Sequence, residues 1–310
     1  MNESEHIPVE TTNSDFKAGY TAIIGEPNVG KSTLLNALLR QKISIVTKKP
    51  QTTRHKILGI LTENKYQIVF LDTPGLLKPK YRLQEAMMKF AMSAIQDADT
   101  ILVMVDASAT TKKLFEGEDN LFKMLKEKNL ILLVNKIDTV EKQVLPSIIM
   151  AYENQLPFKA VLLISAIKRE GIKRLKEEIV NLLPVHPPYY PSDSISEQSE
   201  RFFVCEIIRE KIFEQFREEI PYSTTVDIIE FEERKDKKDN IHAEIYVERD
   251  SQKAILIGKR GVALKAIGIA ARKDIEKLLG RGVFLHLYVK VRERWREDEA
   301  WLKRLGYGDP

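Results

Sequence analysis

The sequence predicts an α/β protein with two domains: a larger one built on a mostly parallel sheet flanked by helices, and a smaller α+β domain after it. Its 310 residues are enough to bury two cores. Short apolar runs at 20–24, 67–71, 101–105, 130–134 and 160–164 alternate with segments of helical spacing, which is typical of parallel strands covered on both faces. A stretch with four prolines and four serines at 184–200 then separates the two halves.

These composition changes set the expected boundaries. We expect an N-terminal tail over residues 1–17, the first domain over 18–184, a linker over 185–200 and the second domain over 201–310. The first residues are acidic and polar, unlike a signal peptide, and no apolar run approaches the roughly 18 residues of a membrane span. A cytoplasmic location is therefore expected. The single cysteine, Cys205, excludes an internal disulfide and is expected to be a buried structural thiol.

The first apolar run leads into a segment that fits the phosphate-loop pattern G-x-x-x-x-G-K-S/T. Its two glycines let the backbone curl so that N–H groups point inward, and the following helix presents its positive N-terminus to the phosphates. Lys31 would reach the β- and γ-phosphates, and the Ser32 hydroxyl would bind Mg²⁺. The predicted phosphate-binding residues are Gly25, Glu26, Pro27, Asn28, Val29, Gly30, Lys31, Ser32 and Thr33.

The second apolar run ends in Asp72, Thr73, Pro74 and Gly75, the pattern D-x-x-G. A carboxylate at the tip of a buried strand can hold Mg²⁺ through water, and the backbone N–H of Gly75 can meet a γ-phosphate. Taken alone, these four residues are equally typical of a turn. Their position at a strand end, after a phosphate loop, favours the nucleotide-binding interpretation.

A polar loop at 48–55 contains the adjacent Thr52 and Thr53, about two dozen residues after the phosphate loop. One of these hydroxyls would complete the coordination of Mg²⁺ and sense the γ-phosphate. We favour Thr53, and Thr52 remains the alternative. A flexible surface loop without this role has the same composition.

The fourth apolar run ends in Asn135, Lys136, Ile137 and Asp138, the pattern N-K-x-D. The Asp138 carboxylate can accept hydrogen bonds from guanine N1 and N2, donors that adenine lacks, so the pattern selects GTP over ATP. Alone, Asp138 is also typical of a helix N-cap. The fifth run leads into Ser165 and Ala166, whose backbone can contact guanine O6, although this last motif has little specificity.

Taken in chain order, four of these signatures together resemble the translation-factor-related branch of Ras-like GTPases. The amino-acid sequences of these motifs, at residues 25–33, 50–55, 72–75 and 135–138, are similar to those of the Era family. The resemblance implies a P-loop GTPase domain that hydrolyses GTP to GDP and phosphate with Mg²⁺. The residues it assigns to catalysis are Lys31, Thr53 and Gly75. Those it assigns to Mg²⁺ binding are Ser32, Thr53 and Asp72, with Asp72 acting through water.

One position departs from the Ras-like pattern. Leu76 follows the D-x-x-G glycine where Ras-like proteins have a glutamine that orients the attacking water. The family resemblance implies a GTPase with a hydrophobic residue at this position. In such GTPases a residue in the place of Asn28 helps to hold K⁺ beside the phosphates.

The second half reads as a helix at 202–219, strands at 224–232 and 241–248, a helical turn at 254–261, a helix at 262–279, a strand at 283–291 and a helix at 294–304. The G-x-x-G turn between two helices resembles the KH RNA-binding fold in its type II order. The glycines let a nucleic-acid backbone approach, basic side chains meet its phosphates, and apolar side chains support unstacked bases. The predicted RNA-binding residues are Ile255, Ile257, Gly258, Lys259, Arg260 and Gly261.

Charge is distributed unevenly in this half. Residues 249–296 hold 13 Lys and Arg against 4 Asp and Glu, a balance of +9, whereas residues 201–248 hold 8 against 13, a balance of −5. A lone G-x-x-G is more often a simple helix connection. Its place within a strongly basic segment favours RNA binding.

Residues 301–307 also resemble the Era family, so the resemblance spans nearly the whole chain. It implies a monomer that binds GTP or GDP and binds 16S rRNA near its 3′ end during assembly of the small (30S) ribosomal subunit. Two alternatives remain open. One is a signalling GTPase whose basic face makes peripheral contact with an anionic membrane, and the other is an RNA-binding protein with an idle nucleotide site.

Overall fold

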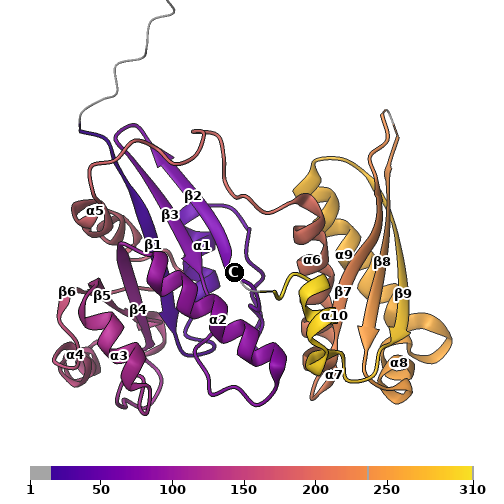
Figure 1. The fold of residues 1–310 in the computed structure, drawn as a ribbon, viewed down its shortest axis with the longest axis horizontal. Coiled ribbons are helices and arrows are strands. Elements are labelled where there is room, and N and C mark those ends of the chain that lie inside the picture. Colours follow the sequence, from indigo (N-terminus) through magenta and orange to yellow (C-terminus); the bar gives the residue numbers. More distant parts are fainter. Residues whose placement is uncertain (1–14, 236, 309–310) are drawn as a thin grey trace, which may run out of the picture.

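The computed structural model describes residues 15–235 and 237–308, which form two packed units joined by an extended segment (Figure 1). Helices and strands alternate through the first unit, except that its second strand is followed directly by its third. In chain order they are β1 (Lys17–Gly25), α1 (Lys31–Leu39), β2 (Ile57–Glu63), β3 (Tyr66–Asp72), α2 (Arg82–Asp97), β4 (Thr100–Asp106), α3 (Asp119–Lys126), β5 (Asn129–Asn135), α4 (Leu145–Glu153), β6 (Phe158–Leu163) and α5 (Ile172–Leu182). Lys17, the last residue of the expected N-terminal tail, is the first residue of β1.

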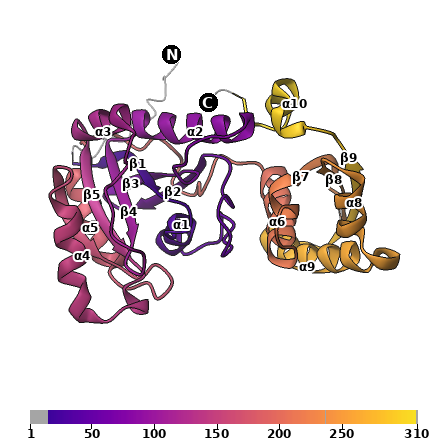
Figure 2. The ribbon, with the colours of Figure 1, turned by 90° about the horizontal axis from the view of Figure 1, so that it is seen from below.

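The strands of this unit form a six-stranded sheet in the order β2-β3-β1-β4-β5-β6. All neighbouring strands are parallel except β2 and β3, which pair antiparallel at one edge. Helices α2, α3 and α4 pack into one apolar cluster and helices α1 and α5 into another, on opposite faces of the sheet (Figure 2). The predicted mostly parallel sheet is confirmed.

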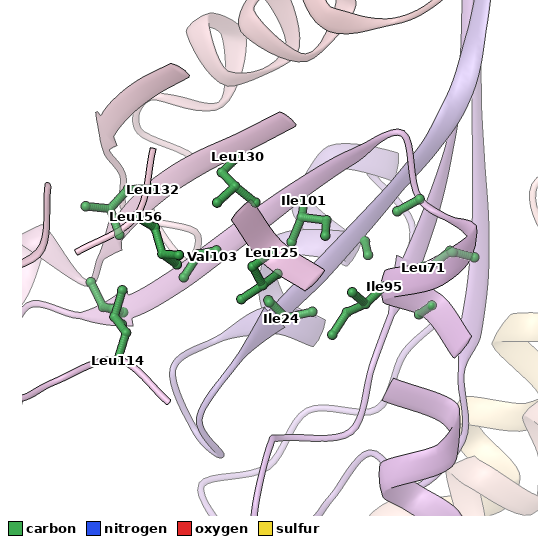
Figure 3. Close-up of a cluster of buried hydrophobic side chains, with 14 of the residues drawn as sticks. Ile24, Leu71, Ile95, Ile101, Val103, Leu114, Leu125, Leu130, Leu132 and Leu156 are labelled. Carbon is green, nitrogen blue, oxygen red and sulfur yellow. The ribbon is translucent and has the colours of Figure 1, made fainter. Parts of the chain in front are cut away.

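The first of these clusters shows why the central strands are apolar along their whole length. In Figure 3, side chains of β1, β4 and β5 meet those of α2 and α3, including Ile24, Ile101, Leu130, Ile95 and Leu125. Burying each such side chain stabilises the fold by roughly 1.5–3 kcal/mol. Strands covered on both faces have no polar face, so their sequences show no alternation.

The parallel arrangement also positions the chemistry. Strands β1, β3 and β5 run in the same direction, and their carboxyl ends lie at one edge of the sheet. The phosphate loop follows β1, Asp72 ends β3, and Asn135 ends β5. The topology therefore gathers the predicted motifs at the edge where ligands bind in sheets of this kind.

Apart from two short helices, which are its second and its last, the second unit has the order helix, strand, strand, helix, helix, strand. Its elements are α6 (Glu200–Gln215), α7 (Ile220–Ser223), β7 (Thr225–Glu232), β8 (Asp239–Val247), α8 (Asp250–Ile257), α9 (Val262–Leu279), β9 (Val283–Val291) and α10 (Glu299–Arg304). The sheet order is β7-β8-β9, with β8 and β9 parallel. Helices α6, α8 and α9 share one apolar core with this sheet, as the predicted α+β domain requires.

Two predicted helices are shorter than the sequence pattern indicates. The helix predicted at 202–219 ends at Gln215, because Phe216 has extended backbone, and the left-handed φ of 55° at Glu218 keeps the next residues out of the helix. The helix predicted at 294–304 is divided into a 3-10 turn over Trp295–Glu297 and α10, because Asp298 between them has extended backbone. Helix α10 begins only after Asp298, whose side chain accepts a hydrogen bond from the Trp301 N–H at 3.1 Å.

The segment predicted as a linker lies along the first unit. The Gln67 side chain accepts hydrogen bonds from the backbone N–H groups of Tyr189 and Tyr190 at 2.7 and 3.0 Å. The Ile60 N–H donates to the carbonyl of Ile195 at 2.8 Å. The segment is therefore attached to β2 and β3 and does not act as a free spacer.

Composition leads to two further expectations, one about the environment of Cys205 and one about membrane-spanning helices. Cys205 is half-buried against the core of the second unit, and burial raises the pKa of its thiol. In the described part of the chain, no helix is both long and apolar enough to cross a membrane.

Candidate nucleotide site and nucleic-acid interface

The phosphate loop needs glycine at both of its glycine positions. Gly25 and Gly30 have φ values of 151° and 104°, a region that other residues rarely adopt. A Cβ atom on Gly25 would lie 2.4 Å from the carbonyl oxygen of Met104, and one on Gly30 would lie 2.5 Å from Nδ2 of Asn135. The loop ends at the N-terminus of α1, whose first turn carries no side-chain cap, so its backbone N–H groups remain open to an anion.

Lys31 lies at the centre of this loop. Its buried Nζ donates to the carbonyl oxygens of Gly25 and Glu26 at 3.0 and 2.8 Å. Burial lowers the pKa of Lys31 to about 8, against the opposing charges of Asp72 and Glu26. A phosphate in the loop would favour the charged form of the lysine.

Three side chains from separate motifs converge beside Lys31. The Ser32 Oγ donates to Oδ2 of Asp72 at 2.7 Å and lies 2.8 Å from Oγ1 of Thr53. Thr52 points elsewhere, because its hydroxyl lies 2.6 Å from that of Thr47 and donates to a carbonyl of the same loop. The geometry therefore places Thr53, and not Thr52, beside the phosphate-loop serine.

The residues at this point fit a small divalent cation. Asp72 is fully buried, and its Oδ1 has no hydrogen-bond partner among the described residues. Burial raises the pKa of this carboxyl, while the Ser32 hydroxyl and the Lys31 charge oppose the shift. One carboxylate and two hydroxyls are a donor set that suits Mg²⁺, which keeps several waters and takes further oxygens from phosphates.

Ser44 is a neighbour of this site that sequence reasoning missed. Its hydroxyl donates to Oδ2 of Asp72 at 2.9 Å. The Asn36 side chain of α1 accepts from the backbone N–H of Ser44 at 3.0 Å and so fixes the loop that carries it. Ser44 belongs to no recognised pattern, so no sequence signal marks it.

The D-x-x-G segment passes directly against the phosphate loop. A Cβ atom on Gly75 would lie 2.7 Å from the backbone nitrogen of Pro27, and the Leu76 N–H donates to the Gly25 carbonyl at 3.1 Å. The Thr73 hydroxyl donates to the carbonyl of Ile23 at 2.8 Å. Gly75 thus lies directly against the phosphate loop, and the half-buried Leu76 packs against the apolar core.

At the end of β5, the Asn135 side chain connects the N-K-x-D motif to the phosphate loop and to the segment of Ser165 and Ala166. Its Nδ2 donates to the carbonyl of Val29 at 2.8 Å, and its Oδ1 accepts from the Ala166 N–H at 3.0 Å. The exposed Asp138 accepts from the Ser165 hydroxyl at 2.5 Å. Because the Ala166 N–H is already used, a bond from it to guanine O6 has to be shared with Asn135.

The remaining residues of the N-K-x-D motif form a tight turn. Lys136 has a φ of 64° and pairs with Oδ2 of Asp106 at 2.6 Å, a carboxylate that sequence reasoning missed although it ends β4. Ile137 and Asp138 lie inside the following 3-10 turn, so Asp138 is not an N-cap. Its carboxylate therefore faces solvent at the site and caps no helix.

Asn28 lies on the solvent side of the phosphate loop with a φ of 66°. Its Nδ2 donates to the carbonyl of Lys48 at 3.2 Å. The side chain therefore links the phosphate loop to the polar loop that carries Thr53.

The G-x-x-G segment of the second unit is a tight turn between α8 and α9. Gly258 and Gly261 have φ values of 72° and 79°, and a Cβ atom on Gly258 would lie 2.7 Å from Cβ of Ala263. Lys259 and Arg260 are exposed between them. The turn thus offers a bare backbone flanked by two cations, which suits a phosphate chain.

The two isoleucines that we predict to support bases lie away from the hollows beside the turn. Ile257 is half-buried against the domain core and Ile255 is half exposed, and neither lines the hollows beside the turn. Those hollows are lined by apolar and basic residues of α9 and β9, namely Val262, Leu264, Lys265, Ile269, Arg272, Leu285 and Leu287. Exposed apolar residues seven apart in the helix, Val262 and Ile269, are the signal that would have found this surface.

Comparison with known sequences matches both units. The family model described as a 50S ribosome-binding GTPase matches residues 20–136, and the KH domain model matches residues 219–296. The fold and the site therefore define a P-loop GTPase joined to a KH domain.

Similarity also extends over the whole chain. It is 46% identical over 299 residues to GTPase Era of Geobacter metallireducens, covering 96% of this chain and 99% of that one. It is 46% identical over 310 residues to the chloroplastic GTPase ERA-like protein of Arabidopsis thaliana, covering 99% and 72%. The chain belongs to the Era family of GTPases.

Solved structures of this family have the same fold. An Aquifex aeolicus Era variant bound to GDP and AlF4⁻ matches with a TM-score of 0.89 at 39% identity, covering 94% of this chain and 100% of that one. An Era complex with MgGDPNP and nucleotides 1506–1542 of 16S ribosomal RNA matches equally well, at a TM-score of 0.89 and 39% identity, covering 94% and 99%.

The convergence of Ser32, Thr53 and Asp72 gives a direct prediction. Thr53→Ala removes the hydroxyl oxygen that is expected to bind Mg²⁺. Mg²⁺-dependent GTP turnover therefore falls by about 10²-fold, as expected for loss of a positioning group. Thr52→Ala is the matched control, and turnover stays within about twofold because this hydroxyl points away from Ser32. Phosphate release against Mg²⁺ concentration measures both. Equal losses in the two variants would contradict the assignment.

Proposed function

We propose that this GTPase is an RNA-binding switch whose nucleotide state controls how the KH domain holds RNA. The observation that carries the proposal is the convergence of Ser32, Thr53 and Asp72 beside Lys31, in a chain that also carries an exposed G-x-x-G turn. The nucleotide site and the RNA site lie in different units, so a signal has to pass between them.

At the nucleotide site, each residue has a separate task. Lys31 and the N–H groups at the start of α1 bind the β- and γ-phosphates, and the Gly75 N–H meets a γ-phosphate oxygen. Ser32 and Thr53 would hold Mg²⁺ directly and Asp72 through water, in line with the MgGDPNP in the related complex. When bound, Mg²⁺ neutralises charge on the phosphate oxygens. Asp138 selects guanine, and equal affinity for ATP and GTP would contradict that role.

Hydrolysis at this site is slow without a partner, because Leu76 cannot orient the attacking water. We propose that K⁺ supplies part of the missing stabilisation and that Asn28 helps to hold it. The Asn28 amide nitrogen already donates to Lys48, so its amide oxygen is the atom that would bind the cation.

This role of Asn28 predicts a salt-specific rate. GTP turnover is higher in K⁺ than in Na⁺ at equal ionic strength, and Asn28→Ala removes the difference while leaving the Na⁺ rate within about twofold. Steady-state phosphate release in the two salts measures this effect. If the unmodified protein turns over at the same rate in both salts, K⁺ has no role here.

At the RNA site, Lys259 and Arg260 meet phosphates while bases stack in the groove between α9 and β9. The related Era complex contains nucleotides 1506–1542 of 16S ribosomal RNA. We propose that this chain binds the same 3′ region during assembly of the 30S subunit. A peripheral membrane role is the competing proposal, and anionic vesicles test it alongside RNA.

Reversing the two charges of the turn tests the RNA proposal. Lys259→Asp with Arg260→Asp lowers affinity for single-stranded RNA from the 16S 3′ end by more than about tenfold and reduces the log–log salt slope by about 2. GTP affinity is unchanged. The matched control is Lys173→Asp with Arg174→Asp, an equal charge change on exposed residues of α5.

Filter binding against salt measures RNA affinity, and flotation with phosphatidylserine vesicles measures membrane affinity. Unchanged RNA affinity in the Lys259 and Arg260 variant would remove these residues from the interface. If the unmodified protein binds vesicles in preference to RNA, the membrane alternative replaces the proposal.

A further inference from the structure

Residues 47–55 form the switch loop, which carries Thr53. One side of this loop faces the nucleotide site, where the Thr53 hydroxyl lies 2.8 Å from Ser32. Its other side is held by the second unit. Nη2 of Arg209, in α6, donates to the backbone carbonyl of Thr52 at 2.5 Å, and Nη1 of Arg54 donates to the carbonyl of Thr224 at 2.8 Å.

Arg209 is fixed by its own surroundings. Its Nε and Nη2 donate to the two carboxylate oxygens of Glu206 at 2.8 and 2.6 Å, and both side chains are almost fully buried. Burial alone would raise the pKa of Glu206, but the charge and hydrogen bonds of Arg209 lower it. The guanidinium also lies 5.4 Å from the ring of Phe213. A planar fork held in this way has little freedom to move.

The bonded carbonyl determines where the next residue points. The Thr52 C=O and the Thr53 N–H belong to one planar peptide unit, so anchoring the oxygen orients the backbone at Thr53. The Thr52 side chain is used locally, through Thr47 and Lys49. Arg209 thus acts on the Thr53 hydroxyl through a single peptide plane.

We infer that Arg209 is a positioning residue for GTP hydrolysis, supplied to the nucleotide site by the RNA-binding unit. This inference rests on the proposed role of Thr53 in holding Mg²⁺. A purely structural ion pair is the alternative, but a buried pair contributes little net stability because both groups lose their hydration. The directional bond to Thr52 is what distinguishes the two roles.

A double-mutant cycle tests the inference on the full chain. Glu206→Gln with Arg209→Gln removes both charges together, so neither is left buried without its partner. In the protein with Thr53, this pair lowers Mg²⁺-dependent GTP turnover by about tenfold. In the Thr53→Ala background the same pair changes turnover by less than about twofold, since the group it positions is gone.

Two further measurements separate positioning from general damage. GDP affinity without Mg²⁺ stays unchanged in every variant. Arg201→Gln, an exposed arginine on the same helix, changes turnover in neither background. If the paired variant fails to fold, Arg209→Lys keeps the charge balance and tests the same point. It raises the half-saturating Mg²⁺ concentration in the protein with Thr53 and leaves it unchanged after Thr53→Ala.

The outcomes are distinct. An equal loss of turnover in both backgrounds, or no loss in either, overturns the positioning role of Arg209. If Thr53→Ala alone leaves turnover unchanged, the proposed Mg²⁺ role of Thr53 fails instead, and the inference fails with it.

Discussion

The hydrogen bonds that hold the switch loop between the two units are the constraint on which the rest of this structure depends. Arg54 is almost fully buried, and its guanidinium reaches three carbonyl groups of residues 221–224 in the second unit. Nζ of Lys49 donates to the carbonyls of Phe213 and Phe216. Residues on both sides of Thr53 are therefore tied to the KH domain. A loop anchored in this way cannot rearrange without affecting how that domain is held.

The D-x-x-G segment is connected to the second unit through the helix that follows it. Helix α2 follows the D-x-x-G segment, and its Leu83, Met87 and Phe90 pack with Trp295, Leu302 and Tyr307 of the second unit. His55, at the end of the switch loop, stacks on Tyr307 at 4.2 Å between ring centroids. Burial lowers the pKa of His55 to about 4, so this contact is uncharged at neutral pH. The switch loop and the helix that follows the D-x-x-G segment thus both contact the second unit through buried residues.

The sequence could predict which motifs gather at one edge of the sheet, because these motifs are short patterns at strand ends. Glycine positions, the lysine and the N-K-x-D residues are set by local backbone geometry and by the chemistry of phosphate and guanine. The partners of the switch loop could not be predicted in this way. Arg209 lies 157 residues after Thr52, and an arginine inside a helical pattern carries no sign that it is buried. Only the packing of two domains reveals it.

Similar reasons explain the other differences. Ser44 orients Asp72 from a loop that has no recognised pattern, and Gln67 fastens the proline-rich segment through its side chain, which composition alone would not show. Ile255 and Ile257, which we predict to support RNA bases, precede the turn and lie in α8. One hollow beside the turn is lined mainly by residues of α9 and β9, because the helix after the turn lies beside the edge strand of the sheet.

The most direct test of this account measures RNA affinity in two nucleotide states of the unmodified full chain. Filter binding of single-stranded RNA from the 16S 3′ end is compared with GDP and with a non-hydrolysable GTP analogue, each with Mg²⁺. The account predicts tighter RNA binding with the analogue, and an equal factor by which RNA tightens binding of the analogue relative to GDP, because coupling between two sites is reciprocal. Equal RNA affinity in the two states would contradict it.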